Sequence, residues 1–166
     1  MAEKNPIRKT DDAARVQART VLTNARFAAI AFADPESGVP AVTRIALTIG
    51  LSGAPVTLIS DLSAHTRALR ANPDCGLLVG EPGAKGDPLN HPRLSISARA
   101  KFLEKSEQAR NHYLTQYPRA KRYFDFGDFN LVQFIIRGAA LNGGFGRAYS
   151  LTGDDLAQPA CQACPD

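Results

Sequence analysis

Apolar residues recur at helical spacing near the start of the chain. After a polar stretch, Asp11 and Asp12 place negative charge where a helix should begin. Apolar side chains then return every three or four positions, at Ala14, Ala18, Val21, Leu22 and Ala25. The pattern predicts a helix that ends near Asn24, with Arg15 and Arg19 on the face opposite to the apolar one.

From residue 26 the pattern changes to short apolar runs that are separated by turn residues. These runs predict strands at residues 26–32, 41–49, 56–60, 76–80, 93–103, 129–136 and 139–145. The turn Gly50-Leu51-Ser52-Gly53 joins the second run to the third, which predicts a hairpin. The run 93–103 alternates, so that one face carries Leu94, Ile96, Ala98, Ala100 and Phe102.

Two further helices are predicted, at residues 64–71 and 106–117, and the second begins at Ser106 as its cap. The stretch 82–92 is rich in proline and glycine and is interpreted as a long loop. Because the strands mostly follow one another directly, an antiparallel barrel is favoured over a parallel sheet. We expect one domain at residues 12–156, mainly β with peripheral helices, between flexible ends at 1–11 and 157–166.

Composition agrees with a single globular domain. The chain has 166 residues, of which 44% are hydrophobic and 22% are charged. These fractions exclude collagen-like, coiled-coil and wholly disordered classes. No apolar run approaches the ~20 residues that cross a bilayer, and no apolar segment typical of a signal peptide follows the first residues. We therefore expect a cytoplasmic protein without a membrane partner.

The charge of the chain is mildly basic and favours anionic small molecules over nucleic acids. Lysine and arginine total 20 against 16 acidic residues, without a dense basic stripe or a nucleic-acid-binding motif. Most of the cations are arginines, which form fixed contacts with phosphate or carboxylate groups. The Cys161–Cys164 pair near the chain end is interpreted as part of a tail in preference to a redox or metal site. No metal site is predicted, and Cys75 is interpreted as a core residue.

The segment 60–67 carries the clearest pattern for binding an anion. A strand ends at Ser60 and Asp61, and a short helix starts at once with Ser63, His65 and Thr66. Free backbone N–H groups and hydroxyls at a helix start attract negative charge. The alternative is that Ser63 is only an N-cap and His65 a solvated residue.

Arg44 lies inside an apolar strand and strengthens the anion hypothesis. By alternation, it shares one face with Val42 and Ala46. We expect the hairpin to bring this strand beside the one that ends at Ser60, so that both reach the same anion. The alternative is an arginine on the solvated side of the sheet, with no ligand.

Three motifs together resemble the FMN-binding split-barrel proteins related to pyridoxamine 5'-phosphate oxidase, and most closely their HugZ-like haem-utilisation branch. They are Ser60-Asp61-Leu62-Ser63-Ala64-His65-Thr66, residues 86–94 and residues 143–148, and the resemblance covers roughly residues 12–156. It implies a six-stranded antiparallel split β-barrel that forms a homodimer. Two FMN molecules are then expected at the subunit interface.

The resemblance also implies roles for individual residues. Arg44 would hold the FMN phosphate, and the backbone of Ile45 and Ala46 would run under the flavin. Ser60 and Asp61 match residues near the ring and the ribityl chain. Ser63, His65 and Thr66 match family residues that lie at the phosphate. Arg93 would reach the flavin of the second subunit.

The chain departs from the oxidases at several positions. Ala64-His65 stands where the oxidases carry Arg-Lys, and Ile49 stands where they carry a lysine. Fewer permanent charges therefore face the phosphate. The substrate-binding region of the oxidases is not recognisable, so the substrate is not predicted, and no catalytic acid or base is named.

Three functions are compatible with the sequence. The first is an FMN-dependent oxidoreductase, in which the flavin supplies the redox chemistry. A haem-binding or haem-degrading protein is the second, with His65, His91 and His112 as the candidate iron ligands. The third is a flavin carrier or sensor without turnover. From their positions in the sequence, His91 is interpreted as a loop-ordering residue and His112 as a solvated one.

Overall fold

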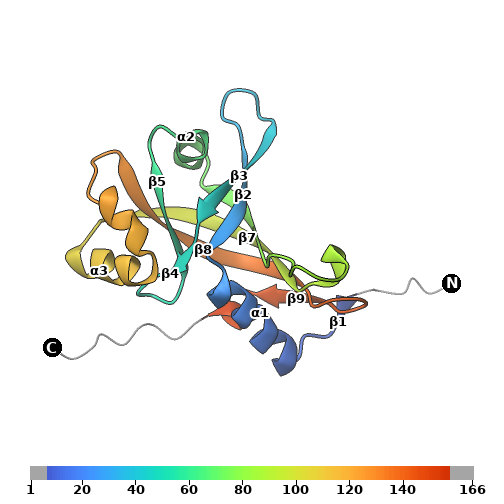
Figure 1. Ribbon diagram of the computed structural model, residues 1–166. Helices are drawn as coiled ribbons and strands as arrows, with labels where there is room; N and C mark the ends of the chain where they lie inside the picture. Colours follow the sequence, from blue (N-terminus) through green and yellow to red (C-terminus); the bar gives the residue numbers. More distant parts are fainter. Residues whose placement is uncertain (1–6, 158–166) are drawn as a thin grey trace.

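The computed structural model describes residues 7–157 (Figure 1). It contains three α-helices, α1 (Asp12–Asn24), α2 (Ala64–Ala71) and α3 (Glu107–Gln116), and three short 3-10 helices, η1 (Pro88–Asn90), η2 (Pro118–Arg122) and η3 (Asp154–Leu156). The strands are β1 (Ile7–Arg8), β2 (Phe27–Ala33), β3 (Pro40–Ala46), β4 (Thr48–Ile49), β5 (Pro55–Ser60), β6 (Asp74–Val79), β7 (Arg93–Leu103), β8 (Phe129–Asn142) and β9 (Ala148–Thr152). The Cys161–Cys164 pair lies outside the described residues.

The strands form one sheet that curls into a split barrel. Hydrogen-bonded neighbours follow the order β1-β9-β8-β7-β6-β2-β3, while β5 pairs with both β4 and β8. The chain turns at Leu47 between β3, which pairs with β2, and β4, which pairs with β5. The barrel is therefore split at this point and is not closed by a continuous ladder. The predicted fold, mainly β with peripheral helices, is confirmed.

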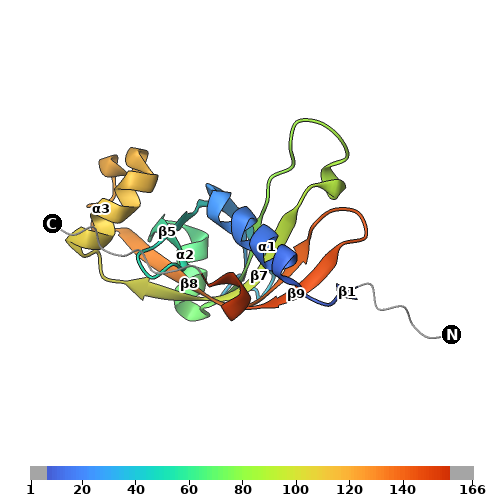
Figure 2. The ribbon, with the colours of Figure 1, turned by 90° about the horizontal axis from the view of Figure 1, so that it is seen from below.

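The core lies inside the barrel and under α1. Helix α1 buries Ala14, Ala18 and Leu22, and it lies along one side of the sheet of β7, β8 and β9 (Figure 2). On that side β7 buries Leu94 and Ile96 completely or nearly so. A second, smaller cluster joins β5 and β8 to α3, with Val56, Leu58, Leu131, Tyr113 and Phe124. No helix of residues 7–157 is long and apolar enough to cross a membrane.

The prediction for the last two strands was wrong. Residues 129–142 form the single strand β8, and Gly138, where a break was expected, pairs with Ser97 inside the strand. The register moves by one residue there: Ser97 pairs with Gly138 and Ala98 with Ile136, so that Arg137 forms a bulge. The chain turns only at Gly144 and Gly146, whose φ angles of 111° and 66° suit glycine, and β9 follows.

Two other expectations also differ from the structure. The run 41–49 is not one hairpin arm, because β3 pairs with β2 over its whole length and only β4 pairs with β5. On the face of α1 opposite the apolar one, Arg15 and Arg19 both bind Asp155 of η3, with Arg15 Nε 2.6 Å from Asp155 Oδ1. Ile7 and Arg8 pair with β9, although a flexible end was expected there.

Candidate functional site

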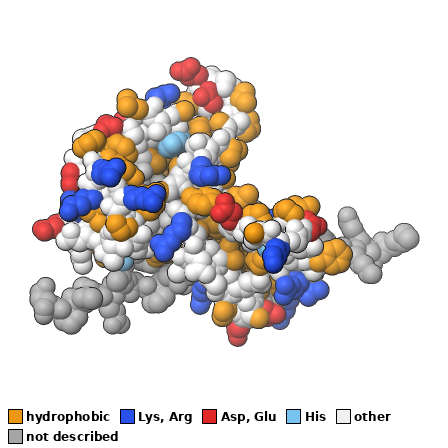
Figure 3. Space-filling view, viewed as in Figure 1, with side chains coloured by type: hydrophobic (Ala, Val, Ile, Leu, Met, Phe, Trp, Pro, Cys, Tyr) orange, Lys and Arg blue, Asp and Glu red, His pale blue; other side chains and the backbone are white. Residues whose placement is uncertain are grey.

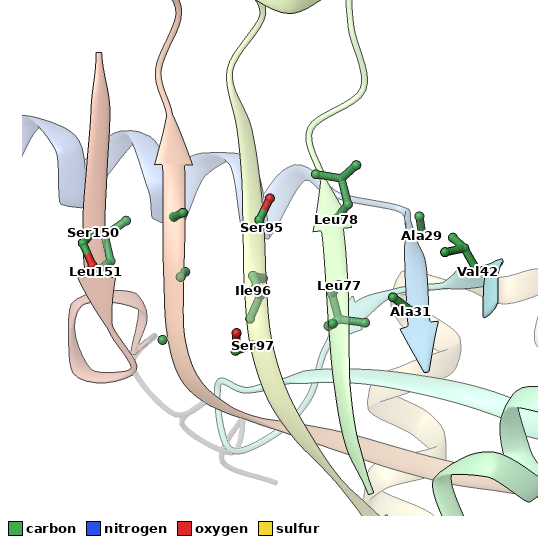
Figure 4. Close-up of a pocket in the computed structure, with 14 residues that line it drawn as sticks. Ala29, Ala31, Val42, Leu77, Leu78, Ser95, Ile96, Ser97, Ser150 and Leu151 are labelled. Atoms are coloured by element: carbon green, nitrogen blue, oxygen red, sulfur yellow. The ribbon is translucent and has the colours of Figure 1, made fainter. Parts of the chain in front are cut away.

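A shallow hollow of about 680 Å³ lies on the sheet face that α1 does not cover. Its walls come from strands β2, β3, β6, β7, β8 and β9 (Figure 4). The lining residues are mostly small or apolar: Ala29, Ala31, Val42, Gly76, Leu77, Leu78, Ser95, Ile96, Ser97, Gly138, Ala139, Ala140, Ser150 and Leu151. We call this feature the sheet-face hollow.

The sheet-face hollow exposes apolar surface. Val42 is 69% exposed and Leu78 is 45% exposed, while α1 lies behind the strands in Figure 4. The space-filling view shows a notch in the molecule with hydrophobic side chains along it and basic side chains around it (Figure 3). An apolar concave surface of this kind is typical of ligand sites and interfaces.

Arg44 stands at the edge of this face. It lies on β3 opposite Ala29 of β2, which lines the sheet-face hollow. The side chain is exposed, and its Cζ lies 4.8 Å from the centre of the Phe27 ring. Within residues 7–157 it forms no ion pair with a carboxylate. The guanidinium group is therefore held in place by an aromatic ring and keeps its charge unneutralised.

A second hollow, of about 540 Å³, adjoins Arg44 and shares Ala29 and Leu78 with the sheet-face hollow. Its other walls come from the end of α1, β2 and the loop after β6, including Thr20, Asn24, Phe27, Gly80 and Pro92. Strand β3 is an edge strand of the described sheet, so the backbone N–H and C=O groups along one of its edges are not paired with another strand. Ile45 points into the core at 5% exposure, and Ala46 is half-buried.

The turn after β5 is held by a network of polar contacts. Ser60 Oγ donates to Asp128 Oδ2 at 2.7 Å and accepts from the Leu62 N–H. Asp61 accepts hydrogen bonds from Arg70 and Asn130, both at 2.9 Å. The hydrogen bond from Arg70 is the main reason that the pKa of Asp61 is lowered. Ser60 and Asp61 thus fix the shape of the turn.

Among residues 7–157, the start of α2 keeps a few polar groups without a hydrogen-bond partner. Ser63 is the N-cap residue but makes no side-chain cap hydrogen bond. The Thr66 N–H donates to Ser63 O at 3.1 Å, whereas the N–H groups of Ala64 and His65 have no acceptor within the helix. His65 is half-buried with its ring 6.3 Å from that of Phe32, and burial lowers its pKa. Thr66 is completely buried and donates to Ser60 O at 2.6 Å, so it stabilises the turn instead of facing a ligand.

Within residues 7–157, no side-chain ion pair joins Arg44 to this turn. Arg44 pairs with Ala29 of β2 in the sheet. The turn instead contacts the Phe32 ring through His65 and forms hydrogen bonds with Asp128 and Asn130. Arg93 begins β7, two residues before Ser95 and therefore on the face of the sheet-face hollow. Its Nη1 donates to Leu89 O at 2.8 Å, which ties it to the long loop. The predicted residues therefore form separate groups, with Arg44 and Arg93 beside the hollows and the others at the turn after β5.

The other two histidines are engaged in the fold. His91 contacts Gly83 N and Lys85 O, which agrees with the loop-ordering role that was predicted. His112 is not merely solvated: its Nε2 lies 2.9 Å from Ile49 O, beside Gln116, and connects α3 to β4. Cys75 is partly buried, and burial raises its pKa to about 11, as suits a packed thiol.

Sequence reasoning missed Phe27 and Asp128, although both support predicted residues. Their roles depend on pairing between distant segments, which no local pattern reveals. A signal for the sheet-face hollow was present: small residues alternate at Ala29 and Ala31, and again at Ser95 and Ser97. Such alternation marks a sheet face that a large side chain does not fill.

Known proteins resemble most of the chain. The sequence profile of the family described as pyridoxamine 5'-phosphate oxidase matches residues 15–139. The Arabidopsis thaliana protein "Non-canonical heme oxygenase HOZ, chloroplastic" is 30% identical over 106 residues, which are 61% of this chain and 31% of that protein. The chain thus spans about a third of this relative.

Two solved structures share the fold. A heme binding protein from Mycobacterium smegmatis is 28% identical with a TM-score of 0.78, over 91% of this chain and 62% of that one. ChuZ from Campylobacter jejuni has a TM-score of 0.79 over 96% of this chain and 68% of that one, and its 18% identity shows the fold alone. With the profile match over most of the domain, these likenesses confirm the resemblance stated from the motifs: the chain belongs to the pyridoxamine 5'-phosphate oxidase family, on its HugZ-like side.

Proposed function

We propose that this protein binds FMN beside the sheet-face hollow and acts as a flavin-dependent oxidoreductase. The observation that carries the proposal is Arg44, an exposed cation without a carboxylate partner at the edge of an apolar hollow. An arginine keeps its charge at any working pH and can bond two phosphate oxygens in a fork. The pyridoxamine 5'-phosphate oxidase family, to which the chain belongs and whose members bind FMN, supports the same cofactor.

The residues present fit the parts of FMN. Arg44 supplies charge for the phosphate, and Ser63 with the first N–H groups of α2 supplies uncommitted donors. The hollow of about 540 Å³ beside Arg44 leaves room for a flat ring, and the free edge of β3 at Ile45 and Ala46 offers backbone groups to it. The bound flavin would supply the redox chemistry, while the chain binds and orients it.

The proposal includes a second copy of the chain, packed against the exposed apolar side chains of β3 and β6 at one side of the sheet-face hollow. Val42 and Leu78 are exposed there, and every residue that lines this hollow belongs to a strand. A partner that buried these side chains would remove apolar surface from water at roughly 25 cal/mol per Å². In a symmetric pair, Arg93 of each copy could then approach the cofactor of the other, as the family resemblance implies.

The test is an equilibrium titration of FMN into wild type and Arg44→Gln. Loss of a charge-assisted hydrogen bond should weaken FMN binding about 10- to 100-fold. Arg119→Gln, which removes an exposed arginine from η2, is the matched control and should bind FMN as wild type does. Equal affinities for wild type and Arg44→Gln would contradict the proposal.

Haem is the second candidate, and the observation that favours it is the pair of haem proteins among the relatives. His65 is the histidine of this chain best suited to bind iron, because the rings of His91 and His112 contact backbone oxygens. Burial also lowers the pKa of His65, which favours the neutral imidazole that binds iron. Haemin titration should then give a Soret shift that is lost in His65→Ala and kept in His91→Ala. A shift that is the same in both variants would argue against His65 as the ligand.

A further inference from the structure

Asp74 lies between two arginines on the outer face of the sheet. Arg99 Nη1 is 3.0 Å and Arg137 Nη2 is 3.3 Å from the same oxygen, Asp74 Oδ1. The three side chains are about half exposed, at 46%, 47% and 54% for Asp74, Arg99 and Arg137. One carboxylate therefore serves two guanidinium groups, and the cluster keeps a net positive charge.

Strand register and a bulge bring these side chains together. Asp74 of β6 is directly opposite Arg99 of β7, so their side chains leave the same face. Arg137 is the residue that the bulge in β8 leaves without a partner in β7. Bulges re-aim side chains, and this one directs a second arginine to a carboxylate that already has one.

The cluster borders the sheet-face hollow. Two residues further along each strand, Gly76 and Ser97 pair with each other and line the hollow, as does Gly138, the neighbour of Arg137. In Figure 4, Ser97 lies on the floor that these strands form. A ligand whose body lay in the hollow could therefore extend an anionic group to Arg99 and Arg137.

A comparison within the molecule separates this cluster from an ordinary surface ion pair. Arg110 on α3 binds Asp125 through three hydrogen bonds of 2.8–3.1 Å, one guanidinium to one carboxylate. Within residues 7–157, Arg99 and Arg137 each make a single contact, in both cases with Asp74 Oδ1, which engages one of the five N–H donors of each guanidinium group. Arg110 and Asp125 thus form a one-to-one pair that uses both carboxylate oxygens, whereas in the Asp74 cluster two guanidinium groups share one oxygen, so that one positive charge is left for another oxyanion.

We propose that Arg99 and Arg137 form an oxyanion-binding site for a carboxylate or phosphate group of a ligand that lies in the sheet-face hollow. Asp74 holds the two guanidinium groups together and competes with the ligand for them. The site is separate from Arg44, which stands across the hollow on β3. The proposal therefore does not depend on FMN binding, and it predicts that the substrate carries an acidic group.

The test is titration of the full-length chain with inorganic phosphate and, separately, with glutarate, followed through the arginine Nε–Hε signals in NMR spectra. Both probes should shift the signals of Arg99 and Arg137, and the tighter probe indicates whether phosphate or carboxylate is preferred. Arg99→Gln and Arg137→Gln should each weaken binding at least about tenfold.

Asp74→Asn gives the sharpest result. If Asp74 only forms a stabilising ion pair, its removal leaves anion binding unchanged. If it competes for the arginines, Asp74→Asn tightens anion binding about three- to tenfold, while the matched change Asp125→Asn does not alter the titration of Arg99 and Arg137. Unchanged affinity in Asp74→Asn, or shifts at Arg110 as large as those at Arg99, would overturn the proposal.

A titration with FMN distinguishes the proposed oxyanion site at Arg99 and Arg137 from the proposed FMN site at Arg44. The double variant Arg99→Gln/Arg137→Gln should lose the phosphate and glutarate response and still bind FMN within about twofold of wild type. Loss of FMN binding in this variant would mean that these arginines belong to the cofactor site, and it would overturn the separate site. If wild type itself does not bind FMN, the anion titrations still decide the present proposal.

Discussion

The two faces of the sheet formed by β6, β7 and β8 use the same strands for different purposes. Towards α1, β7 directs Leu94 and Ile96, which are completely or almost completely buried. Towards the sheet-face hollow, the alternate residues Ser95 and Ser97 are small and exposed. One face holds the fold together, and the other leaves space for a ligand or a second copy. Alternation along a strand thus separates stability from function.

The largest expected effect is on the face towards α1. Leu94→Ala should lower the free energy of unfolding by roughly 2–5 kcal/mol, because it leaves a cavity in a packed core. Ser95→Ala, one residue further on, should change it by no more than about 0.5 kcal/mol. Urea denaturation of both variants measures the difference. Similar losses for the two changes would show that the open face also carries the fold.

A large side chain on the open face should affect association before it affects stability. Ser95→Trp fills part of the sheet-face hollow and should weaken self-association about tenfold or more, because overpacking costs roughly 1–3 kcal/mol. Thr115→Trp on the exposed side of α3 is the control. Sedimentation velocity over a range of concentrations measures both. A wild-type monomer at every concentration would exclude the proposed pair of subunits.

The ion pair between Arg15 of α1 and Asp155 of η3 makes the free energy of unfolding depend on pH. Hydrogen bonds from Arg15 and Thr152 lower the pKa of Asp155 to about 2, below the ~3.9 of an unfolded chain. The unfolded state therefore takes up the proton first, and this part of the stability is lost as the pH falls from about 4 to about 2. Urea midpoints from pH 2 to 5 should fall more steeply for wild type than for Asp155→Asn. Parallel curves would contradict this account.

The smallest effect is expected at the start of α2. Ser63 makes no cap hydrogen bond, so Ser63→Ala should leave the free energy of unfolding nearly unchanged. If its hydroxyl bonds the FMN phosphate, the same change should weaken FMN binding about two- to tenfold. Fluorescence titration with FMN measures this loss. Destabilisation without weaker FMN binding would show that Ser63 serves the helix alone.

Local patterns were enough to predict the helices and most strands, because helical spacing, alternation and turn residues act within a few positions. The three motifs were enough to recognise the family. Pairing between distant segments was not visible, so β3 was expected beside β5 instead of β2. The bulge at Arg137 also escaped prediction, since Gly138 is as compatible with a strand end as with a bulge.

For the candidate site, residue types were more predictable than their partners. Arg44 was identified from its position within an apolar strand, and it is exposed beside a hollow as a binding residue requires. Thr66 was expected at a ligand but turns inward to Ser60 O, because a buried hydroxyl needs an acceptor. The cluster of Asp74, Arg99 and Arg137 spans three strands and could not be read from any one of them.

The most direct test of the central claim compares FMN with riboflavin, which lacks the phosphate, in wild type and Arg44→Gln. If Arg44 binds the phosphate, the variant should lose about 10- to 100-fold in affinity for FMN and almost nothing for riboflavin. Titration by flavin fluorescence gives all four dissociation constants. Equal losses for FMN and riboflavin would contradict the account, because Arg44 would then support the fold or the ring and not the phosphate.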